Sequence, residues 1–417
     1  MIRRPSAILV LLTGLNLFNY LDRLVLAAVL PKIQGELLHH SSFLGGLLET
    51  VFLIGYFVTA PIFGSLGDRM ARKWLIAAGV IVWSGATCAS GLATTAIGLV
   101  AARAFVGIGE ASYATLAPTI IDDITPPEKR GRALAYFYAA TPIGGALGYL
   151  VGGFVEVRWG WRSAFFVAGG PGLVFALVCL MIAEPARKVL TEKPNVRRDL
   201  RRLLTVDLYR QGVYGFCAYT AAIGAFSYWA PTFLFRRYGL ALDKANFRFG
   251  VITVVAGALA TAIGGKWADN VRHEVAAEHG GGALDASEVV ERETVRGLLR
   301  ICAIGTAIGA PLVVACFLAP SSGAFFVLVF FCILALFLGT SPINAVILRA
   351  VPPEVRASAM AVSIFAIHLL GDLWSKPFVG LLIDHLPVDV AMLASLPVAI
   401  ALSAVIWWPR KRQVFPS

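Results

Sequence analysis

Residues 7–30 read AILVLLTGLNLFNYLDRLVLAAVL, and this run decides the class of fold. A helix needs about 20 apolar residues to cross a bilayer core of about 30 Å, and this run is long enough. Similar runs recur along the whole chain, which is 58% hydrophobic and 15% charged. Soluble domains are about 45–50% apolar and about 25% charged. The sequence therefore predicts an all-α membrane protein.

The apolar runs predict twelve transmembrane helices in two six-helix lobes related by pseudo-two-fold symmetry. We place these helices at 7–30, 43–65, 74–94, 96–121, 132–156, 163–183, 208–235, 246–267, 298–318, 323–348, 355–383 and 389–408.

Polar stretches and a weak internal repeat predict the domain organisation. PPEKRGRALA from Pro126 and PPEVRASAMA from Pro352 agree at six of ten positions, and each precedes the fifth helix of its half. Such repeats are typical of transporters that bind substrate between two lobes. We therefore predict an amino-terminal lobe (1–183), a cytoplasmic linker (184–207) and a carboxyl-terminal lobe (208–417). A long cytoplasmic loop at 269–297 has the polar spacing of a helix.

The net charge of +11 has two possible explanations, nucleic-acid binding or membrane orientation. Most of the 36 Lys and Arg residues fall on the side of both termini, which predicts cytoplasmic termini by the positive-inside rule. We expect a multi-pass protein of the inner or plasma membrane and no nucleic-acid partner. The six cysteines lie inside apolar runs without C-x-x-C spacing, so we expect neither a metal site nor a cofactor.

Several motifs resemble one family of transporters. GSLGDRMARK from Gly64 is similar to the signature loop of the major facilitator superfamily, with Ala71 where the usual pattern has glycine. NYLDR at 19–23, GEASYATLAPTIIDD at 109–123 and FYAATPIGGALGYLVGG at 137–153 resemble the spinster-like branch, which includes sphingolipid and lysolipid transporters. Proton symporters of organic anions carry similar N-Y-x-D-R and G-x-x-E-A elements. The resemblance implies a gating role for residues of the signature loop, namely Asp68, Arg69, Arg72 and Lys73.

Ionisable side chains at membrane depth cost about 2.5–3.5 kcal/mol each, so each requires a partner or a function. Away from the helix ends, we place seven such residues at membrane depth: Asp22, Arg23, Glu49, Arg103, Glu110, Asp372 and Lys376. Arg23 shares a helical face with Asn19, whereas Asp22 points about a quarter-turn away. Arg103 and Glu110 share a face of the fourth helix.

A proton-coupled carrier needs a carboxyl group whose proton affinity changes when it gains or loses a basic partner. We hypothesise that Asp22, Arg23 and Glu110 form this switch, in which Arg23 pairs alternately with the acids and with an anionic substrate. The alternative is that these residues form fixed ion pairs that lock the helices together.

Four further residues are secondary candidates. Glu49 lies toward the outer end of its helix, where water could reach it. Asp372 and Lys376 are spaced i, i+4 and are expected to neutralise each other. His368 lies one turn earlier and could titrate near neutral pH, although a single histidine in a helix is more often a packing residue.

We expect polar and aromatic side chains to line an amphipathic substrate cavity. The predicted cavity residues are Asn16, Asn19, Tyr20, Arg23, Arg103, Tyr113, Tyr219, Tyr228 and Trp229.

Together these patterns predict a monomeric, proton-coupled secondary transporter that works by alternating access. The expected substrate is an amphipathic, lipid-like or anionic molecule such as a lysolipid or a sphingoid phosphate. The alternatives are an organic-anion:proton symporter, a lipid scramblase and a non-transporting receptor. No catalytic constellation appears among the loops, so we do not expect an enzyme.

Overall fold

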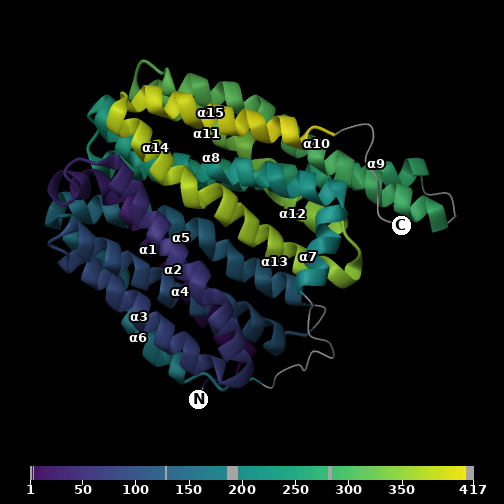
Figure 1. Cartoon of the computed structure of the whole chain (residues 1–417), viewed down its shortest axis with the longest axis horizontal. Coiled ribbons are helices and arrows are strands. Elements are labelled where there is room, and N and C mark those ends of the chain that lie inside the picture. The colour runs from purple at the N-terminus through teal and green to yellow at the C-terminus, as the bar shows by residue number, and fades with distance from the viewer. Residues whose placement is uncertain (1, 3, 127–128, 186–195, 280–283, 410–417) are drawn as a thin grey trace. The chain divides into compact units, whose positions relative to one another are not determined.

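The chain folds almost entirely into helices (Figure 1). The structure is a computed structural model, and it describes residues 2, 4–126, 129–185, 196–279 and 284–409. The first helices are α1 (Pro5–Glu36), α2 (Ser42–Arg69), α3 (Arg72–Leu92), α4 (Ala96–Ile124), α5 (Arg130–Trp159) and α6 (Trp161–Leu180). They are followed by α7 (Val196–Thr205), α8 (Asp207–Tyr238), α9 (Leu242–His279), α10 (Leu284–Phe317), α11 (Ser322–Phe337), α12 (Thr340–Arg349), η2 (Pro353–Val355), α13 (Arg356–Ala366), the π-helix η3 (Ile367–Asp372), α14 (Leu373–His385) and α15 (Val388–Trp407).

Eleven helical segments in the described part of the chain are long and apolar enough to cross a membrane. Two of them are composite, because α11 continues into α12 and α13 continues through η3 into α14. The 32-residue α8 is also long enough, but polar residues such as Gln211 and Arg210 interrupt its apolar sequence. With α8 the number of spans reaches twelve, and the predicted all-α membrane fold is confirmed.

Two compact units make up the chain. Unit 1 comprises Met1–Leu190, Ser227–Val251 and Lys376–His385, and unit 2 comprises Thr191–Phe226, Ile252–Ser375 and Leu386–Ser417. Unit 1 therefore combines the first six helices with the end of α8, the start of α9 and most of α14. The assignment of six helices to each of two lobes stays a prediction.

Glycines allow the helices of unit 1 to pack closely. In α5, a Cβ on Gly144 would lie 2.3 Å from the Leu17 carbonyl oxygen of α1. In α4, a Cβ on Gly107 would lie 2.0 Å from the Phe52 carbonyl oxygen of α2. No real side chain fits at such distances, so α1 with α5 and α2 with α4 form close pairs (Figure 1). These contacts bring α1, α2 and α4 together around the ionisable residues.

The two predicted polar stretches fall partly outside the described residues. The predicted linker contains α7, and its residues 186–195 lie outside them. In the predicted loop 269–297, α9 continues to His279 and α10 begins at Leu284. The glycine run at 280–282 lies outside the described residues.

Candidate functional site

Arg23 and Glu110 form a direct ion pair between α1 and α4. Arg23 Nε donates a hydrogen bond of 2.8 Å to Glu110 Oε2, and Arg23 Nη2 lies 2.7 Å from the same oxygen. The Glu110 side chain is fully buried, whereas that of Arg23 is 16% exposed. The guanidinium is therefore the member of this pair that another molecule can reach.

Aromatic rings surround the Arg23 guanidinium. Its Cζ atom lies 5.1 Å from the ring centroid of Tyr20, 4.7 Å from that of Phe52 and 5.8 Å from that of Tyr56. Cations are attracted to aromatic faces at these distances, particularly where water is scarce. The rings hold the charge in place while adding apolar surface, which suits a ligand with both a charged and an apolar part.

Asp22 lies in a different environment from its neighbour Arg23. Its side chain is 1% exposed, and Thr87 of α3 donates a hydrogen bond of 2.6 Å from Oγ1 to Asp22 Oδ2. The other carboxyl oxygen lies 4.0 Å from Arg103 Nη1. Because Asp22 and Arg23 point about a quarter-turn apart, they belong to different ion pairs. Asp22 lies near Arg103, and Arg23 contacts Glu110.

Arg103 joins Asp22 to Glu49. Its Nη2 atom lies 3.7 Å from Glu49 Oε2, and its Cζ atom lies 5.3 Å from the Phe52 ring centroid. The side chain is fully buried, and within the described residues its three nitrogens make no hydrogen bond. Charge rather than hydrogen bonding therefore holds Arg103 between its two acidic partners.

Glu49 also pairs with Lys376 of α14. Lys376 Nζ lies 3.3 Å from Glu49 Oε1, and both side chains are about 10% exposed. The expected Asp372–Lys376 pair is therefore wrong, since His368 Nδ1 lies 2.8 Å from Asp372 Oδ2. A contact between α14 and α2 thus replaces the expected pair within one helix. Glu49 is buried in this pair, contrary to the expected contact with water.

Six of the seven predicted ionisable residues form one network, which we call the charge network. Arg23 pairs with Glu110. Beside this pair, Arg103 lies between Asp22 and Glu49, and Glu49 also pairs with Lys376. Three acids face three bases, so the network is neutral when all of its members are ionised. A neutral network limits the cost of burying charge, and the loss or gain of one proton leaves it unbalanced.

Contacts around the amino end of α2 tie it to α14 and α8. Asp384 accepts hydrogen bonds of 2.5 Å and 2.9 Å from the backbone nitrogens of Ser42 and Phe43. Tyr228 donates a hydrogen bond of 2.5 Å from its hydroxyl to the Gly45 carbonyl oxygen. Trp229 Nε1 donates one of 3.0 Å to the carbonyl oxygen of Lys376. These bonds and the Glu49–Lys376 pair close one end of unit 1.

Several predicted cavity residues occupy packing positions. Tyr113 and Tyr219 are buried, and their hydroxyls donate to the carbonyl oxygens of Leu12 and Leu336. Asn16 donates to the Phe137 carbonyl oxygen at 2.9 Å. Substrate contact by these residues stays a prediction, as it does for the similarly buried Asn19, Tyr228 and Trp229.

The four predicted gating residues divide into two kinds. Asp68 and Arg69 are exposed at the end of α2. Arg72 and Lys73 are buried at the start of α3, where Arg72 lies 2.7 Å from Asp123 and 3.1 Å from Glu184. Arg72 and Lys73 therefore hold the start of α3 in place within unit 1.

Sequence reasoning missed Thr87, the Phe52 and Tyr56 rings, and Asp384. Thr87 is one of many small polar residues in α3, and its pairing with Asp22 depends on helix packing. Asp384 lies just beyond the predicted helix 355–383, so it was not counted among the membrane-embedded acids. Its position before the end of α14 is the signal that could have identified it as a partner for a helix amino terminus.

The fold and the charge network define a multi-pass transport protein. Residues 12–371 match the family model described as Major Facilitator Superfamily.

Related proteins assign the chain to one branch of this superfamily. It is 35% identical to Protein spinster of Drosophila melanogaster over 88% of this chain and 60% of that protein. It is 31% identical to the probable sphingolipid transporter spinster homolog 2 of Arabidopsis thaliana, over 97% of this chain and 86% of that protein. The chain belongs to the spinster-like branch of the major facilitator superfamily.

A solved structure shows the same fold. A bacterial homolog to the human lysosomal transporter Spinster, in an inward-facing and unoccupied conformation, has a TM-score of 0.79 at 21% identity. The match covers 97% of this chain and 94% of the other.

Proposed function

We propose that this chain is a proton-coupled transporter that moves an anionic, amphipathic lipid by alternating access. The observation that carries the proposal is the Arg23–Glu110 pair. Arg23 is partly exposed and surrounded by aromatic rings, and Glu110 is fully buried. An anionic head group that reaches Arg23 therefore competes with Glu110 for the same guanidinium.

Displacement of Glu110 from Arg23 leaves a buried carboxylate without its cation. An unpaired charge in an apolar site is costly, so the carboxylate takes up a proton. Glu110 Oε1 is buried and makes no hydrogen bond with any described residue, which leaves it open to a proton. We assign the coupled proton to Glu110, because Asp22 keeps Thr87 and Arg103 as partners when substrate binds.

The rest of the charge network connects this exchange to the closed end of unit 1. Loss of the Glu110 charge changes the field on Asp22 and Arg103, and Arg103 in turn acts on Glu49. The Glu49–Lys376 pair joins α2 to α14, as do the bonds from Asp384. In alternating access the contacts at this end of unit 1 break. Among them, the Glu49–Lys376 ion pair is the contact that a change of charge elsewhere in the network can weaken.

At the opposite end, we propose that Asp68 and Arg69 act as a second gate. Both residues are exposed at the end of α2, in the segment that resembles the signature loop of the superfamily. In this scheme lobes 1–183 and 208–417 rock about the substrate. The basic residues near the termini favour a cytoplasmic location for both ends, in the inner or plasma membrane, and the transporter functions as a monomer.

The aromatic surroundings of Arg23 favour a lipid over a small organic anion, and similarity to the probable sphingolipid transporter of Arabidopsis thaliana supports a sphingolipid-like substrate. The test is a thermal-stability screen of purified protein with lysolipids, sphingoid phosphates and carboxylates, followed by flux in proteoliposomes. We expect stabilisation by a phosphorylated or lysolipid ligand and saturable flux driven by a pH gradient. Stabilisation by carboxylates alone would support the organic-anion symporter, and flux independent of the gradient would support a scramblase.

A further inference from the structure

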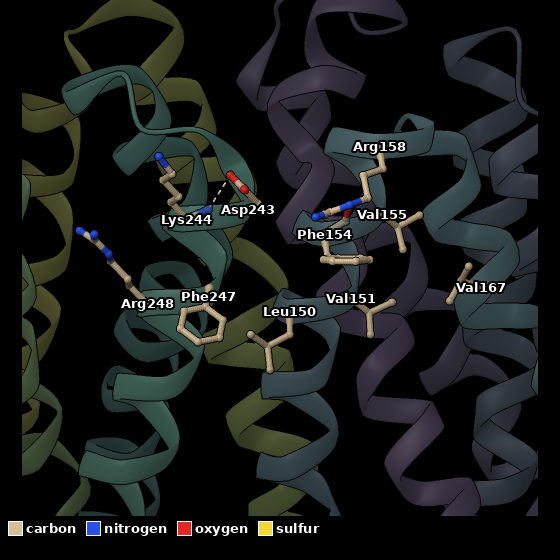
Figure 2. Close-up of a pocket in the computed structure, with 10 residues that line it drawn as sticks. All are labelled: Leu150, Val151, Phe154, Val155, Arg158, Val167, Asp243, Lys244, Phe247 and Arg248. Atoms are coloured by element: carbon tan, nitrogen blue, oxygen red, sulfur yellow. Dashed lines mark hydrogen bonds between the residues drawn. The ribbon is translucent and has the colours of Figure 1, made fainter.

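A groove on unit 1 lies outside the charge network, between α5, α6 and the start of α9 (Figure 2). Its volume is about 840 Å³, within the range of about 300–1,000 Å³ that small-molecule sites occupy. Phe154 on one wall is 49% exposed, and Phe247 on the other is 58% exposed. Because these walls belong to membrane-spanning helices, their uncovered apolar surface faces lipid.

Basic side chains border the groove near the ends of its helices. Arg158 lies in the last turn of α5, and Lys244 and Arg248 lie in the first two turns of α9. Asp243 is the acid that lines the groove, and its Oδ1 atom already accepts a hydrogen bond of 2.7 Å from the Lys244 backbone nitrogen. The lining therefore has an excess of positive charge.

Two of the three basic side chains, Arg158 and Lys244, lie away from the apolar end of the groove, whereas Arg248 lies level with Phe247 (Figure 2). Figure 2 shows Arg158 and Lys244 toward one end, with Leu150 and Val151 beyond Phe154 on the other side. Eight residues of α5 separate Arg158 from Leu150, which is about 12 Å along a helix axis. A charged head at the membrane boundary with a chain that runs toward the bilayer centre fits this arrangement.

The two walls meet at Gly153. A Cβ at this position would lie 2.9 Å from the Leu242 carbonyl oxygen and 2.9 Å from Asn246 Nδ2. Asn246 also donates to the Ala28 carbonyl oxygen at 3.1 Å, which fixes the start of α9 against α1 and α5. The floor of the groove is therefore rigid, and both walls are held in place before any ligand binds.

We propose that this groove binds one anionic membrane phospholipid, with its phosphate near Arg158 and Lys244 and an acyl chain against Phe154 and Phe247. The positive rim selects an anionic head, and the apolar walls select a chain. A cluster of Lys and Arg between spanning helices at a membrane surface attracts anionic lipid head groups. This inference does not depend on the proposed transport of a substrate at Arg23.

The test measures lipid retention by the full-length protein. Purified protein is equilibrated with mixtures of phosphatidylcholine and phosphatidylglycerol, and retained lipid is counted by native mass spectrometry. We expect preferential retention of one phosphatidylglycerol, and about 100-fold weaker retention by the triple variant R158Q/K244Q/R248Q, since each of the three basic residues contributes about five-fold.

Two further variants distinguish a site from general surface charge. The matched control K266Q/R272Q/R300Q removes the same charge from exposed positions of α9 and α10, and it should retain lipid like the wild type. Val151→Trp fills the apolar end without a change in charge and should also weaken retention. Equal loss in both triple variants, or no preference for phosphatidylglycerol in the wild type, would overturn the proposal. Displacement of the lipid by the transported substrate would also overturn it, because the groove would then belong to the transport path.

Discussion

Unit 1 and unit 2 differ in what their spanning helices bury. Unit 1 places six ionisable side chains in one charge network, whereas the centre of unit 2 is formed by apolar residues such as Phe317, Val329 and Ile333. The ion pairs described in unit 2 are more exposed, such as His368–Asp372 at 30% and 15% and Arg349–Glu291 at 30% for each side chain. Buried charge rarely adds stability over a well-packed apolar core. This difference is why we propose that coupling resides in unit 1.

Removal of Arg23 should have the largest effect. We expect Arg23→Gln to abolish substrate-dependent flux in proteoliposomes, because both the substrate anion and Glu110 lose their common partner. The matched control is Arg162→Gln, which removes an exposed pair with Glu36 and should preserve flux. The double variant R23Q/E110Q should be more stable than R23Q but equally inactive. Flux near the wild-type level in R23Q would remove the basis for assigning coupling to unit 1.

The close packing that assembles the network gives the next prediction. Gly107→Ala places a Cβ against the Phe52 carbonyl oxygen, so we expect a loss of about 1–3 kcal/mol in stability from overpacking. Gly85→Ala is the control, because a Cβ on Gly85 meets no atom within 4 Å. Thermal unfolding in detergent should show a lower Tm for the first variant and an unchanged or slightly higher Tm for the second. Equal Tm values would contradict the close contact of α2 with α4.

The Glu49–Lys376 pair should have a smaller, conformational effect. We expect Lys376→Gln to open the contact between α2 and α14 more often, by about ten-fold, which corresponds to about 1.4 kcal/mol. The measurement is the labelling rate of a Ser42→Cys sensor in a background without other cysteines. Lys32→Gln removes a more exposed pair with Glu156 and serves as the control. If both variants label at the wild-type rate, the ion pair does not hold the closed end.

The smallest effect is expected in unit 2. His368→Asn removes a partly exposed pair, and such pairs contribute about 0–1 kcal/mol. Flux and its dependence on pH should remain close to those of the wild type. A change in the pH dependence as large as that of a unit 1 variant would show that coupling extends into unit 2, and the comparison of the units would then need revision.

The sequence predicted the membrane fold because a helix that crosses a bilayer needs an apolar run as long as the hydrocarbon core is thick. It also predicted that Arg23 and Glu110 would act together, since they are charged positions on helices with few other charges. It did not predict that Arg103 lies between Asp22 and Glu49, because contacts between helices depend on their packing and rotation. Lys376 was assigned to Asp372 because an i, i+4 spacing is visible in the sequence, whereas its contact with Glu49 depends on how α14 packs against α2.

The central claim is that substrate and Glu110 compete for Arg23, and proton uptake on binding tests it most directly. Substrate is added to purified protein in weakly buffered solution, and the change in pH is recorded for the wild type, Glu110→Gln and Asp22→Asn. We expect the wild type and Asp22→Asn to take up about one proton per bound anion, because the displaced carboxylate becomes neutral. Glu110→Gln should bind without proton uptake. Unchanged uptake in Glu110→Gln, or its loss in Asp22→Asn alone, would contradict the account.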